Sequence, residues 1–450
     1  MPAGASSVRT HCLSPTRLRP PIDAAVGPAR YARMFPELPA FEADEAFLRA
    51  LGRADGICDC GDAADSPDSL STIAAGWPMF GQFVAHDITA DRSALQSHVD
   101  PRALRNARAP QLNLECLYGD GPVGQPFLFQ RDDPAKFLLG DDGHDVCRNN
   151  EGIAIIGDPR NDSHMVMAQM HLAMLKAHNA FVDDARARRV SDRAVFDTAA
   201  RELRWHYQAA ILDEFLPSLV GEGLVDEITT DGPRWFRPDD VFIPLEFADA
   251  AYRYGHCQIR QRYQLNRGSE PVPIFPDLLG FRPVPRRLAV DWTLLFDAPG
   301  SAAAQRAKKI DGRLARPLIQ LPVAITGECE IDEYHSLAVR DLQRGQGVGL
   351  PSGEAVARHL GVTPLAPEEV GLTRTGWRGD TPLWYYILRE AAVTTSGDRL
   401  GPVGGRIVAE VIFTLLDRDT TSVRFVDDGW KPRRTLLDLL TASEPAAAMR

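Results

Sequence analysis

Gln82 and His86 are the first residues in this chain whose types and spacing could do chemistry together. They lie four residues apart in the largely apolar run Phe80–Ile88. Side chains at this spacing stack on one face of an α-helix, so both polar groups point the same way. Histidine can hold or release a proton near neutral pH, which suits acid–base catalysis. Taken alone, His86 is more simply explained as a hydrogen-bonded core histidine, because buried polar groups need partners.

A second histidine follows a glycine, in Tyr252-Arg253-Tyr254-Gly255-His256. Gly255 removes a side chain at a point where a bulky group could approach. A flat macrocycle whose metal is bound by His256 would be such a group, and a helix-packing glycine beside a core histidine is the alternative. A metal-binding histidine normally donates its other N–H to an acceptor. Asp341, which precedes a glycine-rich turn, is the candidate acceptor.

An arginine stands just before an expected helix, in the turn Gly157–Ser163. Asp162 or Ser163 would cap that helix, and Arg160 is either a surface residue or a fixed positive charge next to a site. The helix itself carries three histidines at seven-residue spacing, His164, His171 and His178, interleaved with methionines. Met and His at this spacing usually line a core-facing flank, so we predict no metal site there.

The composition is that of a soluble globular protein, with 450 residues, 44% hydrophobic and 25% charged. A net charge of −11 argues against nucleic acid as the main partner. No apolar stretch has membrane-spanning length. Met1–Pro15 lacks the apolar core of a secretory signal, so we expect a cytoplasmic location, with secretion by a non-standard route as the alternative. Seven cysteines form no evident disulfide framework, and Cys58 and Cys60 are expected as reduced thiols in a surface loop.

Helical periodicity dominates the chain and predicts one large, mainly α-helical domain over residues 41–440. An N-terminal arm, 1–40, is expected to be partly extended or disordered, and 441–450 forms a C-terminal tail. Short β segments are expected at Gly152–Ile156 and Val423–Val426. The expected helices are Asp44–Leu51, Pro78–Thr89, Asp162–Arg188, Asp192–Phe215, Leu245–Leu265, Gly353–Leu360, Pro382–Ala392 and Gly404–Asp417.

Taken in order, these segments resemble the animal-type haem peroxidases (the peroxidase-cyclooxygenase superfamily), and more closely their bacterial members. The resemblance runs from about Pro67 to Asp419. The motifs that carry it are Phe80-Gly-Gln-Phe-Val-Ala-His-Asp87, Leu112-Asn-Leu-Glu-Cys-Leu-Tyr-Gly119, Gly157-Asp-Pro-Arg160, His171 with Lys176-Ala-His-Asn179, Glu214-Phe-Leu-Pro217, Tyr252-Arg-Tyr-Gly-His256, Leu342-Gln-Arg344 with Gly349-Leu-Pro351, and Gly401-Pro-Val-Gly-Gly405.

The resemblance implies a mainly α-helical fold that holds haem b between the Gln82/His86 helix and the His256 segment. On the distal side, His86 would be the acid–base residue, Gln82 its neighbour over the iron, and Arg160 the distal arginine. On the proximal side, His256 would bind the iron, and Asp341 would stand where the family usually has asparagine. Arg253 and Arg344 would face the haem propionates.

The implied activity is the reduction of hydrogen peroxide through an oxoferryl intermediate, with oxidation of small aromatic (phenolic) or halide donors. A role in the response to oxidative stress follows from it. One alternative is a fatty-acid dioxygenase of the cyclooxygenase-like branch, which needs a tyrosine three residues before the proximal histidine. Arg253 stands there, and Tyr254 lies one residue away. A non-enzymatic haem-binding relative is the other alternative, and the sequence leaves the oligomeric state and the physiological donor open.

The chain departs from the family at residues that modify the haem and bind calcium. Ala85 and Ser163 replace the two carboxylates that form ester links, so we predict haem b without such links. His164 stands where one member has a sulfonium-linked methionine. For the calcium (Ca²⁺) that the family binds beside the distal histidine, Asp87, Asn113 and Glu115 are the candidate ligands. Alanine replaces a threonine ligand at position 109 and Gln111 would offer its carbonyl, so weaker calcium binding is expected.

Overall fold

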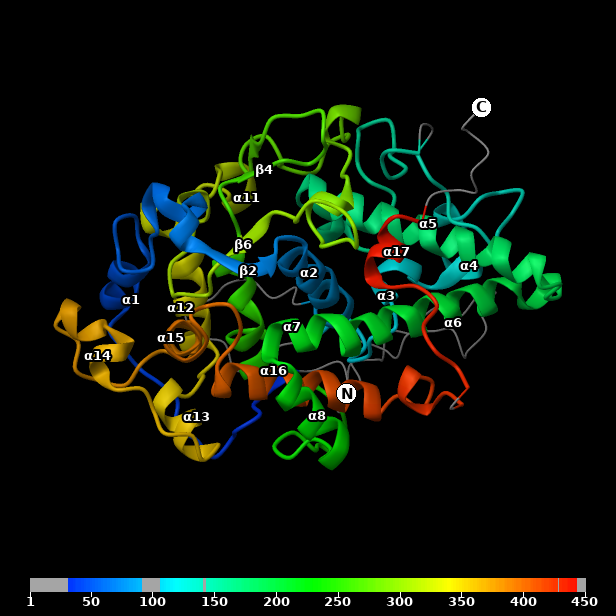
Figure 1. Cartoon of the computed structure of the whole chain (residues 1–450). Coiled ribbons are helices and arrows are strands. Elements are labelled where there is room, and N and C mark those ends of the chain that lie inside the picture. Colours follow the sequence, from blue (N-terminus) through cyan, green and yellow to red (C-terminus); the bar gives the residue numbers. More distant parts are fainter. Residues whose placement is uncertain (1–30, 91–105, 141–142, 428, 443–450) are drawn as a thin grey trace, which may run out of the picture.

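The computed structural model describes residues 31–90, 106–140, 143–427 and 429–442 (Figure 1). The mainly α-helical prediction is confirmed, because helices carry most of the regular structure. The longer helices are α1 (Glu45–Gly52), α2 (Gly76–Ile88), α5 (Met165–Ala187), α6 (Asp192–Ala210), α8 (Glu222–Asp231), α12 (Leu337–Gly347), α13 (Gly353–His359), α15 (Leu383–Thr395) and α16 (Pro402–Asp417).

Short elements connect the longer helices. The short α-helices are α3 (Glu115–Tyr118), α4 (Gly121–Gly124), α7 (Leu216–Val220), α9 (Leu245–Ala248), α10 (Arg316–Ile319), α11 (Val323–Thr326), α14 (Pro367–Val370) and α17 (Leu436–Leu440). The 3₁₀ turns are η2 (Gly61–Asp65), η3 (Pro67–Ser69), η5 (Pro126–Leu128), η6 (Pro159–Asp162), η8 (Ala251–Gln258), η9 (Arg286–Leu288), η10 (Trp292–Leu294), η11 (Asp332–His335), η12 (Leu372–Thr375) and η13 (Val423–Phe425), and η7 (Ile211–Phe215) is a π-helical turn.

The described strands are short and pair two by two. Strand β1 (Tyr31–Ala32) is parallel to β3 (Ile243–Pro244). Strand β2 (Leu70–Ala74) is antiparallel to β6 (Arg306–Lys308), and β4 (Arg262–Tyr263) to β5 (Val272–Pro273). Both β segments expected from the sequence are wrong. Gly152–Ile156 contributes only an isolated bridge at Ala154, and Val423–Val426 contains the turn η13, whose first turn is capped by Ser422.

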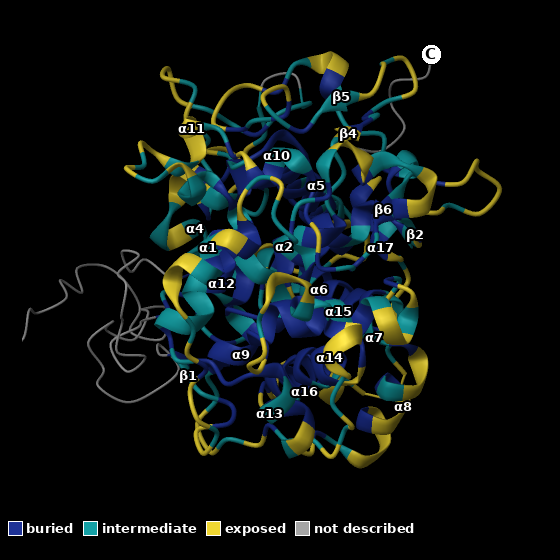
Figure 2. Ribbon diagram, turned by 90° about the vertical axis from the view of Figure 1, so that its left-hand side faces the viewer, coloured by how far each residue is buried: buried dark blue, intermediate teal, exposed yellow. Residues whose placement is uncertain are grey.

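Most of the buried apolar side chains form one continuous cluster, which runs from Tyr31 to Leu440. Figure 2 shows the buried residues gathered in the interior along α9, α15 and α16, with exposed residues in the peripheral turns and loops. Tyr31, Met34 and Phe35 belong to this core. Glu246 accepts hydrogen bonds from the backbone N–H groups of Met34 (2.7 Å) and Phe35 (3.3 Å). Glu246 also pairs with Arg33 (2.7 Å). The start of the described chain is thereby fastened to α9.

Most of the predicted helices are found within a few residues of their expected bounds. For α5, however, the predicted N-cap is wrong. His164 caps the helix, and its Nδ1 accepts from the N–H of Met167 at 3.3 Å. Asp162 is unavailable for capping, because its carboxylate is paired with Arg148 at 2.7 Å. The helix α12 was not among the predicted helices.

The predicted helix Leu245–Leu265 is wrong. The segment forms α9, then η8, and then an extended stretch that leads into β4. Ala250 breaks the α-helix with φ −137° and ψ −76°, and Ile259 is extended. Tertiary bonds favour this path, because Arg253 and His256 both donate to the carboxylate of Asp341 on α12, at 2.9 and 2.6 Å. Local helix propensity yields to such contacts.

The expectation that Cys58 and Cys60 lie on the surface is also wrong, because both side chains are buried. They are free thiols, as are the other cysteines of the described residues. Burial raises the pKa of the Cys58 thiol well above its usual value. None of the helices in the described part of the chain combines the length and apolar character that a bilayer crossing requires.

Candidate functional site

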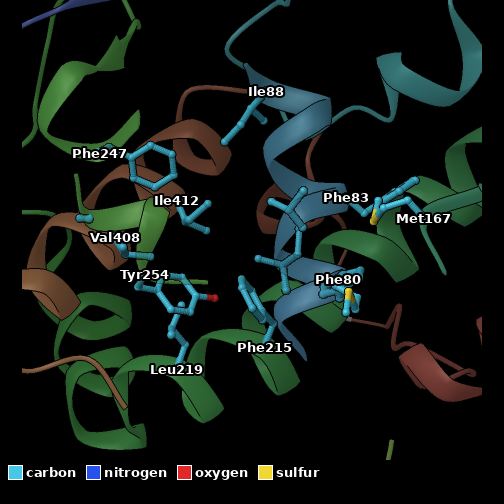
Figure 3. Packing of buried hydrophobic residues seen from close by; sticks show 14 of the residues in the cluster. Phe80, Phe83, Ile88, Met167, Phe215, Leu219, Phe247, Tyr254, Val408 and Ile412 are labelled. Atoms are coloured by element: carbon cyan, nitrogen blue, oxygen red, sulfur yellow. The ribbon is translucent and has the colours of Figure 1, made fainter. Parts of the chain in front are cut away.

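A cavity of about 630 Å³ lies between α2 and η8. Gln82 and His86 line it from α2, and Arg253 and His256 line it from η8, so the two histidines predicted from the sequence share one space. Figure 3 shows how α2 is held there: Phe83 lies next to Met167 of α5 on one side, and Phe247 and Tyr254 lie on the other. Much of the remaining lining is apolar. Phe281 (60% exposed) and Ile325 (41% exposed) mark where the cavity meets solvent.

His256 is oriented by a buried carboxylate. Its Nδ1 donates to Oδ2 of Asp341 at 2.6 Å, and Asp341 is fully buried on α12. Arg253 donates to the other oxygen, Oδ1, at 2.9 Å. The 3₁₀ geometry of η8 explains the shared acceptor, because side chains three residues apart are eclipsed in a 3₁₀ helix. With Nδ1 engaged, Nε2 of His256 is the ring nitrogen left for the cavity.

The two arginines expected at propionates occupy different surroundings. Arg253 lines the cavity and bonds to both Asp249 and Asp341. Arg344 is not among the residues that line the cavity, and its Nε lies 3.3 Å from Oδ1 of Asp249. Asp249 therefore connects the two guanidinium groups at one end of η8.

His86 is oriented by an amide. Its Nδ1 donates to Oδ1 of Asn161 at 2.8 Å, and Nδ2 of Asn161 donates to Nδ1 of His171 at 3.0 Å. This assignment follows from the direction of the hydrogen bonds in the chain. It leaves Nε2 of His86 without a proton, so this nitrogen can accept one. Burial, together with the positive charge of Arg160, lowers the pKa of His86 to about 3.

Gln82 is oriented by His164. Nε2 of His164 donates to Oε1 of Gln82 at 2.9 Å, because Nδ1 of the same ring already accepts from Met167 at the start of α5. Burial lowers the pKa of His164 to about 4, which keeps the ring neutral. The amide nitrogen of Gln82 is then the group that can donate into the cavity.

Arg160 does not line the cavity. Its Nε and Nη2 donate to the two carboxylate oxygens of Asp158 at 3.1 and 2.7 Å, and Nη2 also donates to the backbone carbonyl of His86 at 2.9 Å. The paired arginines hold the pKa of the Asp158 carboxyl well below its usual range, although burial opposes them. Arg160 thus lies behind His86, and, together with burial, its charge helps to lower the pKa of that histidine.

The three candidate calcium ligands lie near one another at α3, but their oxygens are bonded to protein donors. Asp87 accepts from the backbone N–H of Leu114 at 2.9 Å, and Glu115 pairs with Arg108 at 3.2 Å. Oδ1 of Asn113 accepts from the N–H of Glu115 at 2.9 Å. Burial raises the pKa of Asp87 to about 6. Within the described ranges, no group of three or more His, Cys, Asp or Glu side chains is placed to hold a metal ion.

Sequence reasoning missed the hydrogen bonds by which three residues orient others in the site. Asn161 and His171 orient His86, and His164 orients Gln82. His164 and His171 had been assigned to a core-facing flank of the helix, which holds for His171 but leaves out their hydrogen bonds. The position of Asn161, directly after Arg160, was the one local signal, since a turn next to a site often supplies such a group.

Comparisons with known proteins agree on one family. The model of the animal haem peroxidase family matches residues 96–368. Heme peroxidase 2 of Caenorhabditis elegans is 26% identical over 112 residues, which cover 23% of this chain and 16% of that protein. The chain therefore matches only a small part of that relative.

Solved structures of similar fold include Peroxidase A of Dictyostelium discoideum, with a TM-score of 0.60, 16% identity and 88% of each chain covered. The fatty acid alpha-dioxygenase of Arabidopsis thaliana has a TM-score of 0.62 at 13% identity, with 90% of this chain and 74% of that chain covered. The enzyme of the same kind from Oryza sativa has a TM-score of 0.59 at 14% identity, over 88% and 76% of the two chains. At these identities the likeness shows the fold alone.

Proposed function

Since the chain belongs to the animal haem peroxidase family, we propose that it reduces hydrogen peroxide and oxidises small aromatic donors. One observation carries the proposal. Two imidazoles line the same cavity, and each has its Nδ1 engaged, by Asn161 on one side and by Asp341 on the other. Each therefore presents Nε2, one to bind a metal and one to accept a proton.

The described residues fit a haem group at this place. A cavity of about 630 Å³ is within the usual range of cofactor sites, about 300–1,000 Å³. A Cβ added to Gly255, next to His256, would meet nothing within 4 Å, so space is open beside the proximal histidine. Arg253 places a guanidinium, the type of group that binds a propionate, at the wall of the cavity. His256 would hold the iron through Nε2, with Asp341 fixing its ring.

When bound, haem would supply the redox chemistry, taking two oxidising equivalents from peroxide. The protein's own contribution is proton transfer and charge. Nε2 of His86 accepts the proton of the inner peroxide oxygen and delivers it to the outer oxygen, which leaves as water. The amide nitrogen of Gln82 can donate a hydrogen bond to the peroxide. Arg160 does not line the cavity, and its contribution is to help burial lower the pKa of His86, which keeps that ring neutral and able to accept the proton.

The apolar part of the cavity supports an aromatic donor rather than a strongly charged one. Phe275, Phe281 and Leu321 line it, and Phe281 is the most exposed of the three. A flat phenol would bury its ring against such side chains. Halide oxidation is the second donor class that we keep, and comparing the rates with guaiacol and with bromide distinguishes the two.

The proposal is tested by absorption spectra of the purified holoprotein before and after peroxide, followed by guaiacol turnover. We expect a Soret band that changes on addition of peroxide and returns as guaiacol is consumed. Holoprotein without a Soret band would overturn the assignment of the site. A band that peroxide leaves unchanged would favour a haem-binding relative without activity.

A fatty-acid dioxygenase is the second candidate, because tyrosines line the cavity near His256. The hydroxyl of Tyr254 points toward Phe215 (Figure 3), and the buried hydroxyl of Tyr252 has no hydrogen-bond partner among the described residues. Arg253, however, stands three residues before His256, where this chemistry requires a tyrosine. Oxygen uptake with a polyunsaturated fatty acid would favour the dioxygenase, and its absence alongside guaiacol turnover favours the peroxidase.

We expect acidified organic solvent to extract all of the haem as unmodified haem b. An ester link needs a carboxylate, and among the described residues that line the cavity there is no Asp or Glu. Ala85 and Ser163, the positions of the ester-forming residues in the family, both line it. The pyridine haemochrome spectrum and the mass of the extracted haem check this. Haem that stays with the denatured chain would contradict it.

Asp341→Asn should lower the iron–histidine stretching frequency of the ferrous protein. A charged acceptor strengthens the hydrogen bond from Nδ1 of His256 and makes the imidazole a stronger donor. In this chain the asparagine oxygen could serve only one of the two donors that now share Asp341, His256 and Arg253. Resonance Raman spectroscopy measures the shift. The matched control is Asp249→Asn, which removes charge next to Arg253 without touching His256 and should leave the frequency unchanged.

A further inference from the structure

Asp87, a residue that calcium would need, has both oxygens bonded to the protein. Its Oδ2 accepts from the N–H of Leu114 at 2.9 Å and from the hydroxyl of Tyr207 at 3.3 Å, and its Oδ1 accepts from the N–H of Cys116 at 3.3 Å. Leu114 has a φ of +60°, a conformation that a non-glycine residue rarely adopts. The carboxylate thus holds the strained turn that begins α3.

The neighbouring side-chain oxygens are engaged in the same way. Oε2 of Glu115 accepts from the N–H of Ala109 at 3.1 Å. Oε1 of Gln111 accepts from the amide of Asn113 at 3.3 Å, and the N–H of Gln111 donates to the carbonyl of Ala109 at 2.8 Å. Calcium requires six to eight oxygens that converge on one point. These groups are bonded to one another instead, so the residues do not fit the ion.

A cation is nevertheless buried among them. The side chain of Arg108 is 5% exposed, and its guanidinium donates to Oε1 of Glu115 (3.2 Å), to the carboxylate of Asp158 and to the carbonyl of Gly157 (3.4 Å). It therefore contacts two carboxylates and a carbonyl, which are the ligand types that calcium prefers. A guanidinium keeps its charge at every ordinary pH and can bond to several oxygens at once.

We propose that the guanidinium of Arg108 takes the place of calcium in this chain, so that the distal side is held together without a metal ion. Arg108 is a positioning residue. Asp158, which it pairs with, also accepts from Arg160 through both carboxylate oxygens. Arg160 in turn donates to the carbonyl of His86. The buried cation is thus connected to the cavity through two successive hydrogen-bonded residues.

The first test measures the dependence of the wild-type holoprotein on calcium. We expect the same thermal midpoint in millimolar calcium and in excess EGTA, and less than one calcium per chain by elemental analysis. Calcium bound in stoichiometric amount, or a midpoint that falls in EGTA and returns with calcium, would overturn the proposal. Neither readout depends on peroxidase turnover, so the outcome is separate from that of the proposed function.

The second test compares two variants, Arg108→Ser and Arg148→Ser. Arg148 is a matched control, because it is 7% exposed and pairs with two carboxylates, Asp145 and Asp162, whose exposure resembles that of the Arg108 partners. Removing Arg108 takes one cation from Glu115 and leaves Asp158 paired with Arg160 alone, and removing Arg148 takes a cation from both Asp145 and Asp162. Each change weakens buried ion pairs, and we expect each midpoint to fall by about 3–5 °C in a chain of this size.

Calcium should affect the thermal midpoints of the two variants differently. In Arg108→Ser, millimolar calcium is expected to recover part of the lost midpoint, and isothermal titration should detect its binding. Arg148→Ser should recover nothing. Equal recovery in the two variants, or none in Arg108→Ser, would mean that Arg108 forms an ordinary buried ion pair and would overturn the replacement of calcium.

Discussion

His86→Ala is expected to slow the reaction of the holoprotein with hydrogen peroxide by about 10²–10⁴-fold, the usual contribution of a general acid–base group. The variant loses the nitrogen that accepts the proton, while Asn161 and Arg160 stay in place. Burial and the charge of Arg160 lower the pKa of His86 to about 3, so its ring is neutral and able to accept a proton at ordinary pH. Stopped-flow absorbance of the Soret band against peroxide concentration gives the second-order rate constant.

His359→Gln is the control for this experiment. His359 is a partly exposed histidine whose Nε2 lies 3.1 Å from Glu37, and it is not among the residues that line the cavity. Its replacement should leave the rate constant unchanged. If the His86→Ala protein reacts with peroxide as fast as the wild type, His86 has no part in the mechanism.

His256→Gly is expected to abolish stable haem binding, with a loss larger than the roughly 10–100-fold in affinity that removal of an outer hydrogen-bond partner costs. The variant removes the proposed bond to iron and also leaves Oδ2 of Asp341 buried without its donor. The ratio of Soret to protein absorbance after gel filtration measures the retained haem. Added imidazole should restore part of the band, since it fits the vacated space and can donate to Asp341.

His86→Ala serves as the control for haem retention, because the role proposed for His86 is in the reaction with peroxide and not in binding iron. It should keep the wild-type Soret ratio. If His256→Gly retains its haem in full, or if His86→Ala loses it, the assignment of the proximal and distal sides is wrong.

Much of the fold could be predicted from the sequence where a helix carries a clear apolar stripe. The helices α1 and α13 lie close to their expected bounds because their buried positions recur at helical spacing, and α2 and α16 do so although they are buried on most sides. The helix predicted over Leu245–Leu265 is wrong because Arg253 and His256 bond to Asp341, and no local pattern reports a partner so distant in the sequence. The strand predicted at Val423–Val426 is wrong because the same apolar residues suit either a capped turn or a short strand.

In the candidate site, sequence reasoning identified the residues that line the cavity better than those that orient them. Gln82, His86, Arg253 and His256 were predicted and line one cavity. The hydrogen bonds of Asn161 and His164 depend on how α5 and η6 approach α2, which is a property of the tertiary structure. The buried guanidinium of Arg108 was missed for the same reason, since its partner Asp158 lies 50 residues away in the chain.

The distance in sequence between His256 and Asp341 has a consequence for how the holoprotein is made. The two residues that bond at 2.6 Å are separated by 85 positions. A ribosome adds about 5–20 residues per second, so His256 is synthesised roughly 4–17 s before the carboxylate that orients it. If His256 binds the iron as proposed, firm capture of haem waits until the nascent polypeptide extends past residue 341. The cofactor is then needed late in translation or after release. Haem supplied earlier would meet a His256 imidazole that no carboxylate yet orients.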